Sequence, residues 1–304
     1  GFEREAYKLV EDTSSGTHLT HSSVVSVSTG NNYTYSVFAK GTERVLQMVL
    51  ATGFSPNFCN FDLSDGTIGS NNGLVDSNIT SFSNGWYRCD ITVLSTGASA
   101  NIEFILAESK TSSRYTTYQG DGTSGIYIAY AQLEEQISAT SLMLPTTEGS
   151  TSSRVADSVT GAGSQSLFGG VSSSGVLYAE IAALSLLDNR ERQISLSSDA
   201  NSFLRIQYGG TPDQIYCFIY INGVKVCDIR ETLNTTNFNK VALRFSSLGY
   251  TVYINGVFIE TDSFAGNFTS YPLTNLSYNN GSTNFLGKTK GLAVLNYLSD
   301  AEMI

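Results

Sequence analysis

The stretch 120–135 and the polar run after it constrain the fold more than any other part of the chain. The stretch begins with the glycine-rich turn Gly120-Asp121-Gly122 and continues as a largely apolar run, which predicts a long buried strand over 125–135. Residues 144–157 contain few large apolar side chains, so this segment cannot supply a core strand or helix and indicates a tether. We therefore expect a first domain over 1–145, a linker over 146–163 and a second domain over 164–304.

The composition is that of an all-β protein. A chain of 304 residues is long enough for two ordinary domains. Aromatic residues make up 11% and charged residues only 14%, and the apolar runs are short, which predicts strands joined by polar loops. The formal net charge of −10 opposes binding to nucleic acid, since a duplex binder needs a basic face. No apolar run approaches the ~20 residues that span a bilayer, so we expect no membrane insertion.

The four cysteines are too few for a disulfide scaffold in a chain of this length, and no C-x-x-C pair points to zinc. We expect them to act as small buried hydrophobic residues with free thiols. No signal peptide is visible. The chain starts at Gly1 without a Met, which indicates a fragment or a processed product.

The first domain has the alternating patterns of a β-sandwich. In the segment 86–94 the side chains at 87, 89, 91 and 93 point toward the core, whereas Trp86, Arg88 and Asp90 point to the other side. Residues 52–85 are rich in Gly, Ser, Asn and Asp, so we expect loops there. Short strands separated by turn signals predict a jelly roll. The strands expected in this domain are 5–10, 18–27, 33–40, 45–51, 86–94, 102–106 and 125–135.

Two Asn-Gly pairs organise the second domain. The pairs at 222–223 and 255–256 each lie between apolar runs and favour two-residue hairpin turns, in which both central residues have positive φ. If the first pair is such a turn, Phe218 pairs with Cys227, and Cys217 and Cys227 lie on opposite faces of the hairpin. We therefore predict no disulfide. The expected strands are 176–187, 193–197, 203–208, 215–221, 224–229 and 239–245.

The last residues predict the start of a helix. Ser299 is the expected N-cap and Glu302 its capping-box partner.

Two motifs resemble known families. The run GDGTSGIYIAYAQLEE, with the tether PTTEGS and the R-x-A-D element at 154–157, resembles a module common in phage tail and virion-surface proteins. The resemblance implies a carbohydrate-binding-module-like jelly roll. The pattern NKVALRF followed by YTVYINGV resembles concanavalin-like (laminin G-like) domains of phage structural proteins. Together they imply two tandem β-sandwich (jelly-roll) domains joined by a short Ser/Thr-rich tether.

The resemblance also implies a function and a setting. Such proteins are tail fibre, tail spike or head-decoration proteins at the virion surface, without catalysis. The implied partners are a glycan of a bacterial host or environmental surface, other virion proteins, and further copies of the chain, with a trimer favoured. In similar proteins one more strand precedes the position of Gly1, so we expect the first sheet to lack a strand and to have an unpaired edge. Two alternatives remain open: an accessory module of a polysaccharide-degrading enzyme, and a structural spacer or oligomerisation domain.

The sequence shows none of the common catalytic motifs. G-x-S-x-G, H-E-x-x-H, the P-loop and G-x-G-x-x-G are all absent from the sequence. His18 and His21 are three residues apart, so on a strand they face opposite sides. A glycoside hydrolase needs two carboxylates about 5–10 Å apart, and the most apolar strand of the second domain offers only Glu180. We therefore expect no enzymatic activity.

We expect no organic cofactor, but a structural Ca²⁺ is a candidate. Asp121 in the glycine-rich turn is the candidate ligand, because Ca²⁺ takes six to eight oxygen ligands. The alternative is that Asp121 only completes a tight turn. In calcium-binding relatives the last strand carries an Asp, where this chain has Gln132.

Candidate glycan-binding residues lie in the first domain. Sugars stack on aromatic rings and exchange hydrogen bonds with polar side chains. The alternative for Trp86 is packing in the core, and for Tyr115 and Tyr118 it is ordinary surface exposure. A competing site is the rim of the second domain around 188–192. The candidates are Trp86, Arg88, Asp90, Tyr115, Tyr118, Tyr130 and Gln132.

Overall fold

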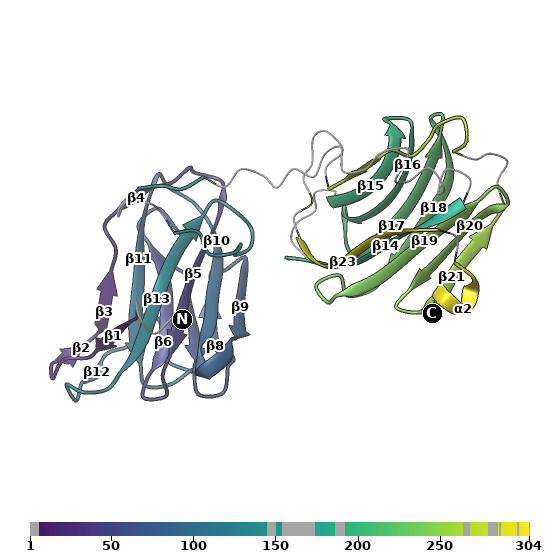
Figure 1. Ribbon diagram of the computed structural model, residues 1–304. Helices are drawn as coiled ribbons and strands as arrows, with labels where there is room; N and C mark the ends of the chain where they lie inside the picture. The colour runs from purple at the N-terminus through teal and green to yellow at the C-terminus, as the bar shows by residue number, and fades with distance from the viewer. Residues whose placement is uncertain are drawn as a thin grey trace. The chain divides into compact units, whose positions relative to one another are not determined.

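The chain divides into two compact units, Gly1–Arg154 and Val155–Ile304 (Figure 1). Each unit is a β-sandwich, which confirms the predicted all-β class with two tandem sandwiches. Within the described part of the chain, no helix is long and apolar enough to cross a membrane. The predicted linker over 146–163 lies outside the described residues except for 150–153. The computed structural model describes residues 6–144, 150–153, 174–185, 192–263, 268–278, 285, 287–296 and 298–303.

The first unit contains two antiparallel sheets and one two-stranded ribbon (Figure 1). The first sheet has the order β1-β13-β5-β10-β9. The second has the order β3-β11-β6-β7-β8, with β4 also paired to β11, and the ribbon joins β2 to β12. In each sheet a late strand lies between two early ones, which is the Greek-key arrangement of the predicted jelly roll. The bounds are β1 Tyr7–Val10, β2 Ser15–Gly16, β3 His18–His21, β4 Val25–Ser26, β5 Asn32–Lys40, β6 Val45–Ala51, β7 Phe58–Asp62, β8 Thr67–Asn72, β9 Asp76–Ser81, β10 Tyr87–Leu94, β11 Ser99–Ala107, β12 Tyr118–Gln119 and β13 Gly125–Glu134.

Alternation along β5 and β10 forms the core of this unit. Cys89, Ile91 and Val93 point inward and are fully or almost fully buried, as the pattern predicts. Strand β6 is buried on both faces, and the amide of Gln47 donates hydrogen bonds to Asn60 Oδ1 and to the Ser113 carbonyl. These bonds satisfy a buried amide that would otherwise destabilise the sheet.

The expectation of loops over 52–85 is wrong. Strands β7, β8 and β9 occupy much of that segment, followed by a 3-10 turn at Ser83–Gly85. These strands pair through the backbone although Asn, Ser and Thr dominate β8 and β9, so their polar side chains hide them from a pattern of apolar residues. The single strand expected over 18–27 is likewise two strands, β3 and β4.

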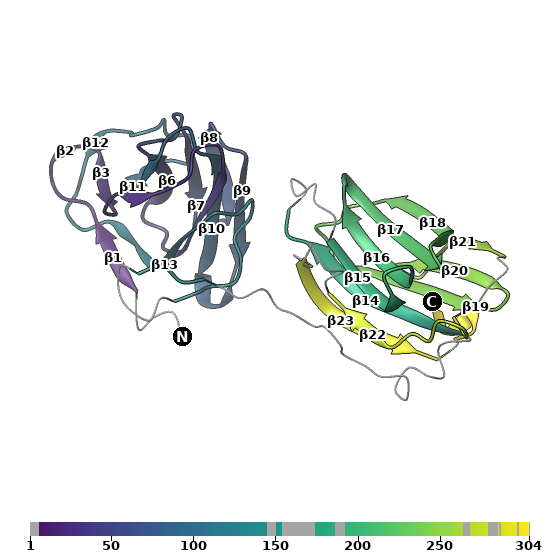
Figure 2. The same cartoon turned by 90° about the horizontal axis from the view of Figure 1, so that it is seen from above.

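The described residues of the second unit form two five-stranded antiparallel sheets (Figure 2). One sheet has the order β21-β20-β19-β14-β23, and the other has the order β18-β17-β16-β15-β22. Their inner faces enclose a core in which Leu177, Ile206, Ile219 and Leu243 are completely buried. The bounds are β14 Ser174–Ala183, β15 Arg192–Asp199, β16 Ser202–Gly209, β17 Thr211–Ile221, β18 Val224–Thr232, β19 Asn239–Ser246, β20 Gly249–Ile254, β21 Val257–Asp262, β22 Asn275–Ser277, β23 Gly287–Leu295 and α2 Asp300–Met303.

Both Asn-Gly pairs form the predicted hairpin turns. Asn222 and Asn255 have φ of 49° and 53°, and the glycine after each also has positive φ. The predicted helix start is confirmed as well, because the backbone N–H and hydroxyl of Ser299 both donate to the Glu302 carboxylate.

The predicted register of the first hairpin is wrong beyond the turn. Ile221 pairs with Val224 as expected, but a β-bulge shifts the pairing between Ile219 and Tyr220. Cys227 therefore pairs with Ile219, and Phe218 pairs with Asp228. This one-residue shift moves Cys227 to the core face, which Cys217 also occupies.

Candidate functional site

The side of the first sheet opposite the core carries the predicted glycan-binding residues of β10. Trp86, Arg88 and Asp90 do lie on that side, but the prediction that they form an open surface is wrong. Trp86 has 2% of its surface exposed and Asp90 6%, and Arg88 is half-buried.

Part of this side is covered by the segment that follows β13. Residues 136–143 fold back over this side of the sheet and are bonded to it at several points. The hydroxyl of Thr34 donates to the Gln136 carbonyl at 2.9 Å, and the Met143 N–H donates to Gln132 Oε1 at 2.7 Å. The Thr140 N–H and hydroxyl donate to the Glu134 carboxylate. The segment thus buries a row of polar side chains that alternation alone assigns to solvent, Gln132 among them.

Burial shifts the pKa values of Asp90 and Arg88 on this side of the sheet. Burial raises the pKa of Asp90 to about 6. The Asn78 amide donates a hydrogen bond to the Asp90 carboxylate at 3.2 Å, which opposes part of this rise. Burial lowers the pKa of Arg88, whose guanidinium donates to Ser36 Oγ at 2.9 Å and lies 5.6 Å from the Phe38 ring centre. These groups are engaged within the fold, so they offer little to a ligand from solvent.

Trp86 packs as the alternative predicted. Its indole belongs to a small apolar cluster with Phe38 and Ala129, against which Ala6 and Tyr130 also pack. Tyr130 has φ of 53° at the bulge of β13, which displaces the strand between Ala129 and Gln132. The structure therefore brings Trp86 and Tyr130 together, in a cluster and not on an exposed platform.

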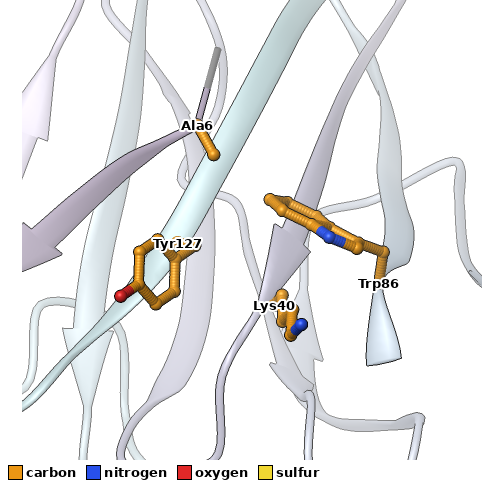
Figure 3. Close-up of a pocket in the computed structure, with 4 residues that line it drawn as sticks. All are labelled: Ala6, Lys40, Trp86 and Tyr127. Atoms are coloured by element: carbon orange, nitrogen blue, oxygen red, sulfur yellow. The ribbon is translucent and has the colours of Figure 1, made fainter. Parts of the chain in front are cut away.

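One edge of this cluster is hollow. A cavity of about 300 Å³ is lined by Ala6, Lys40, Trp86 and Tyr127 (Figure 3). Tyr127 on β13 pairs with Lys40 on β5, and Tyr87, the neighbour of Trp86, pairs with Ala39 on the same strand. Adjacent strands thus place the two aromatic rings on either side of the lysine (Figure 3). We call this hollow the Trp86–Tyr127 groove.

The groove continues along the same end of the sheet. A second hollow of about 390 Å³ shares Lys40 and Tyr127 and reaches Lys8, Glu43 and Tyr87. Lys8 Nζ lies 3.1 Å from Glu43, and its hydrogen bond lowers the pKa of that carboxyl. With 44% of its surface exposed, Tyr127 offers a ring to solvent, beside groups of both charges. A ring surface beside charged hydrogen-bonding groups is what a sugar requires.

The other predicted tyrosines lie elsewhere. Tyr115 contacts the second sheet, since its hydroxyl donates to Glu103 and its N–H donates to Gln47 Oε1. Tyr118 is buried, and its hydroxyl donates to Glu11 at 2.7 Å. Neither residue lines the Trp86–Tyr127 groove, and the prediction of an ordinary surface position for Tyr118 is wrong as well.

Asp121 is a turn residue in this geometry. Its Oδ1 accepts the N–H groups of Thr123 and Ser124, both at 2.7 Å, and hydrogen bonds from these two residues hold its pKa far below the usual range. The Arg44 guanidinium lies 3.4 Å from Oδ2. A bound guanidinium and occupied lone pairs do not fit a Ca²⁺ site, which needs many free oxygens. Among the described residues no group of three or more His, Cys, Asp or Glu side chains is placed to hold a metal ion.

Sequence reasoning missed Lys40 and Tyr127, although a signal for Tyr127 was present. Ile126 points into the core, so alternation directs Tyr127 to the other side of the strand. Lys40 carries no such signal, because only the pairing of β5 with β13 places it beside Tyr127.

Comparisons with known proteins give no family. No protein-family model and no curated protein matches the sequence. Among solved structures, sheep galectin-11 in complex with glycerol matches at 10% identity, over 47% of this chain and 100% of the galectin, with a TM-score of 0.32. Domains LG4-5 of the mouse laminin α1 chain match at 10% identity, over 97% of this chain and 88% of theirs, with a TM-score of 0.31. The LG1-3 region of the laminin α2 chain matches at 10% identity, over 93% of this chain and 64% of its own, with a TM-score of 0.34. At these values we draw nothing about function from the likenesses.

Proposed function

We propose that this chain is a non-catalytic glycan-binding protein, and that the Trp86–Tyr127 groove of the first unit is a saccharide site. The observation that supports the proposal is the exposed ring of Tyr127 across Lys40 from Trp86, at the mouth of a cavity of about 300 Å³. A cavity of this volume is at the lower end of the range of small-ligand sites and suits one or two sugar rings.

The roles of the lining residues follow from their chemistry. The Tyr127 ring stacks on the apolar face of a pyranose, and the edge of the Trp86 indole closes the far wall. Lys40 lines the cavity between them, and the apolar stem of its side chain contributes to the surface on which the sugar packs. The ion pair of Lys8 and Glu43 offers both a donor and an acceptor further along the groove. None of these roles requires a bond to be made or broken.

The virion setting is part of the same proposal. The sequence motifs at 120–135 and 239–257 resemble those of phage tail and virion-surface proteins, and this resemblance supports a tail fibre, tail spike or head-decoration protein that binds bacterial-surface or environmental glycans. Other virion proteins and a homo-oligomer, with a trimer favoured, belong to that setting. Light scattering on the purified chain tests the oligomer, and a stable monomer at micromolar concentration contradicts it.

A glycan array probed with the full chain tests the binding function. We expect one or a few neutral or weakly charged saccharides to bind, and binding to weaken when Tyr127 is replaced by Ala. A chain that binds no glycan on a bacterial-surface array contradicts the proposal. Release of reducing ends from a panel of polysaccharides contradicts its non-catalytic part.

A further inference from the structure

The segment that follows β13 is held on the first sheet with little apolar packing. Residues 136–143 contain one buried side chain, that of Ser138, and the larger apolar side chains of Ile137, Leu142 and Met143 are only half-buried. None of these three belongs to the apolar clusters that the described residues of the first unit form. A segment with few buried apolar contacts opens more readily than the strands of a core. We call residues 136–143 the lid.

Hydrogen bonds attach the lid to three neighbouring strands of this sheet. On β5 the hydroxyl of Thr34 donates to the lid, and on β13 the side chains of Gln132 and Glu134 accept from it. On β10 the hydroxyl of Thr92 donates to the Ile137 carbonyl at 3.4 Å. These four side chains of the sheet belong to residues that are at most 9% exposed. The lid is therefore closed over a buried polar surface.

Asp90 lies next to the residues that hold the lid. It is two residues before Thr92 on β10, so both side chains are on the side of the sheet opposite the core. In the register of the sheet Asp90 is directly opposite Ser36, and Ser36 is directly opposite Gln132. The attachment points of the lid thus lie along the strand from this carboxyl and across the sheet from it.

The surroundings of Asp90 favour its neutral form. Burial opposes ionisation most strongly, since only 6% of the residue is exposed. Within the described part of the sheet, the Asn78 amide on β9 is the one group that donates a hydrogen bond to this carboxyl. The charge of Arg88 also favours ionisation, whereas the charges of Asp76 on β9 and Glu134 on β13 oppose it. The lid itself carries no titratable side chain.

Polar atoms on both the lid and the sheet lack partners when the lid is closed. Gln132 Nε2 on the sheet and Ser138 Oγ on the lid are buried and have no hydrogen-bond partner among the residues that the structure describes. Buried polar atoms without partners destabilise the closed arrangement, and in an open lid both atoms bind water. Closure is therefore only weakly favoured, so that one ionisation beneath the lid changes the population of the open form.

We propose that residues 136–143 are a pH-sensitive lid over the polar side of the first sheet, and that the neutral carboxyl of Asp90 keeps this lid closed. The closed lid is most stable below about pH 4, where Asp90 is protonated whether the lid is open or closed. Its stability falls as the pH rises through about 6, because the open lid lets the carboxyl ionise in water. Opening uncovers Arg88, Asp90 and Gln132, the polar row that alternation assigns to solvent. The lid acts independently of the Trp86–Tyr127 groove, whose lining residues make none of the bonds named above.

Hydrogen exchange of the full chain, measured by NMR, tests the lid. The N–H groups of Thr140 and Met143 are bonded to the sheet, so their exchange rates, divided by the intrinsic rate at each pH, report opening. Closure moves the pKa of Asp90 from its ordinary 3.8 to about 6. We therefore expect opening to increase about tenfold between pH 5 and pH 7.5. Equal protection at the two pH values overturns the proposal. Protection as high as that of the N–H groups of the central strand β10 also overturns it, because the segment then opens only when the whole unit unfolds.

Two variants assign the pH response to Asp90. Asp90→Asn removes the titrating group and keeps the shape of the side chain, so the protection of Thr140 and Met143 is expected to be the same at pH 5 and pH 7.5. Glu108→Gln is the matched control, since Glu108 is an exposed carboxyl directly after β11 in the other sheet of the same unit. This control is expected to keep the tenfold response of the parent. A response that persists in Asp90→Asn, or that disappears in Glu108→Gln, overturns the proposal.

Discussion

Cys217 and Cys227 lie side by side on the core face of one hairpin, with Cys227 Sγ 3.5 Å from the carbonyl oxygen of Cys217. Both thiols are free, as are those of Cys59 and Cys89. The predicted absence of a disulfide is therefore confirmed, but the reason given for it, opposite faces, is wrong. The bulge in β18 makes this the one pair of cysteines that shares a hairpin face.

The four thiols are expected to be inert in the native protein. Burial raises the pKa of Cys59 and of Cys227 to about 12 and raises the pKa values of Cys89 and Cys217 as well. Since only the thiolate reacts, a colorimetric thiol reagent at pH 8 is expected to detect almost none in the folded chain and four after denaturation without reductant. Detection of two in the denatured sample means that Cys217 and Cys227 have oxidised.

Asp90→Asn is expected to stabilise the first unit at neutral pH. Burial raises the pKa of Asp90 to about 6, above its value in the unfolded chain. The protonated form is therefore favoured in the fold, and the stability it contributes is present below pH 4 and is lost as the pH rises through about 6. At pH 7 the variant is expected to gain about 2 kcal/mol in free energy of unfolding.

The pH dependence separates this effect from a change in packing. Other carboxyls titrate in both proteins, so the relevant quantity is the difference in free energy of unfolding between variant and parent. Measured by urea unfolding at several pH values, this difference is expected to shrink as the pH is lowered from 6 to 4. A difference that stays constant over this range shows that ionisation of Asp90 is not its cause.

Arg44→Met is expected to destabilise the first unit strongly. Arg44 makes two hydrogen bonds to Glu11, at 2.6 and 2.7 Å, and the Glu11 side chain is completely buried. Burial opposes ionisation of Glu11, but hydrogen bonds from Arg44, Tyr118 and the Asp121 N–H outweigh it and lower the pKa. Without Arg44 a buried carboxylate loses its cation, so the free energy of unfolding is expected to fall by about 3–5 kcal/mol. Thermal or urea unfolding measures this loss.

The double variant Glu11→Gln/Arg44→Met is the control for that experiment. It removes both charges, so it is expected to recover part of the stability that Arg44→Met loses. Because the pKa of Glu11 is lowered in the fold, ionised Glu11 contributes stability that is present above pH 5 and is lost as the pH falls through the folded pKa. The parent is expected to show this loss, and the double variant is not. A double variant less stable than Arg44→Met contradicts the assigned role of the pair.

The strands of the cores were predictable because their side chains alternate or are continuously apolar. Strands β5, β6 and β10 begin and end within one residue of the predicted segments. The polar strands β8 and β9 were not predictable in this way, since backbone pairing holds them and their side chains carry no pattern. Alternation also assigned Asp90 to the correct side of its sheet, but it could not show that residues 136–143 cover that side.

Only some of the residues that line the Trp86–Tyr127 groove could be predicted from the sequence, for the same reason. Trp86 was a candidate from its residue type. Lys40 joins it because the chain brings β13 back beside β5, a contact between segments nearly ninety residues apart, about which a local pattern says nothing. Sites built by strand order in a jelly roll thus depend on topology as much as on motifs.

Tyr127→Ala tests the groove without disturbing the core. The ring is 44% exposed and lies outside the buried cluster around Trp86, so the variant is expected to unfold at nearly the same temperature as the parent. Loss of a stacked ring is expected to weaken binding of a saccharide identified on the array by about 1 kcal/mol or more, roughly fivefold or more in Kd. Tyr7→Ala is the matched control, because Tyr7 lies on the neighbouring strand β1, is 78% exposed and does not line the groove. Trp86→Ala is less informative, since it also removes a buried indole and is expected to cost about 3 kcal/mol or more in stability. If Tyr127→Ala and Tyr7→Ala bind the saccharide as tightly as the parent, the ligand does not occupy the groove.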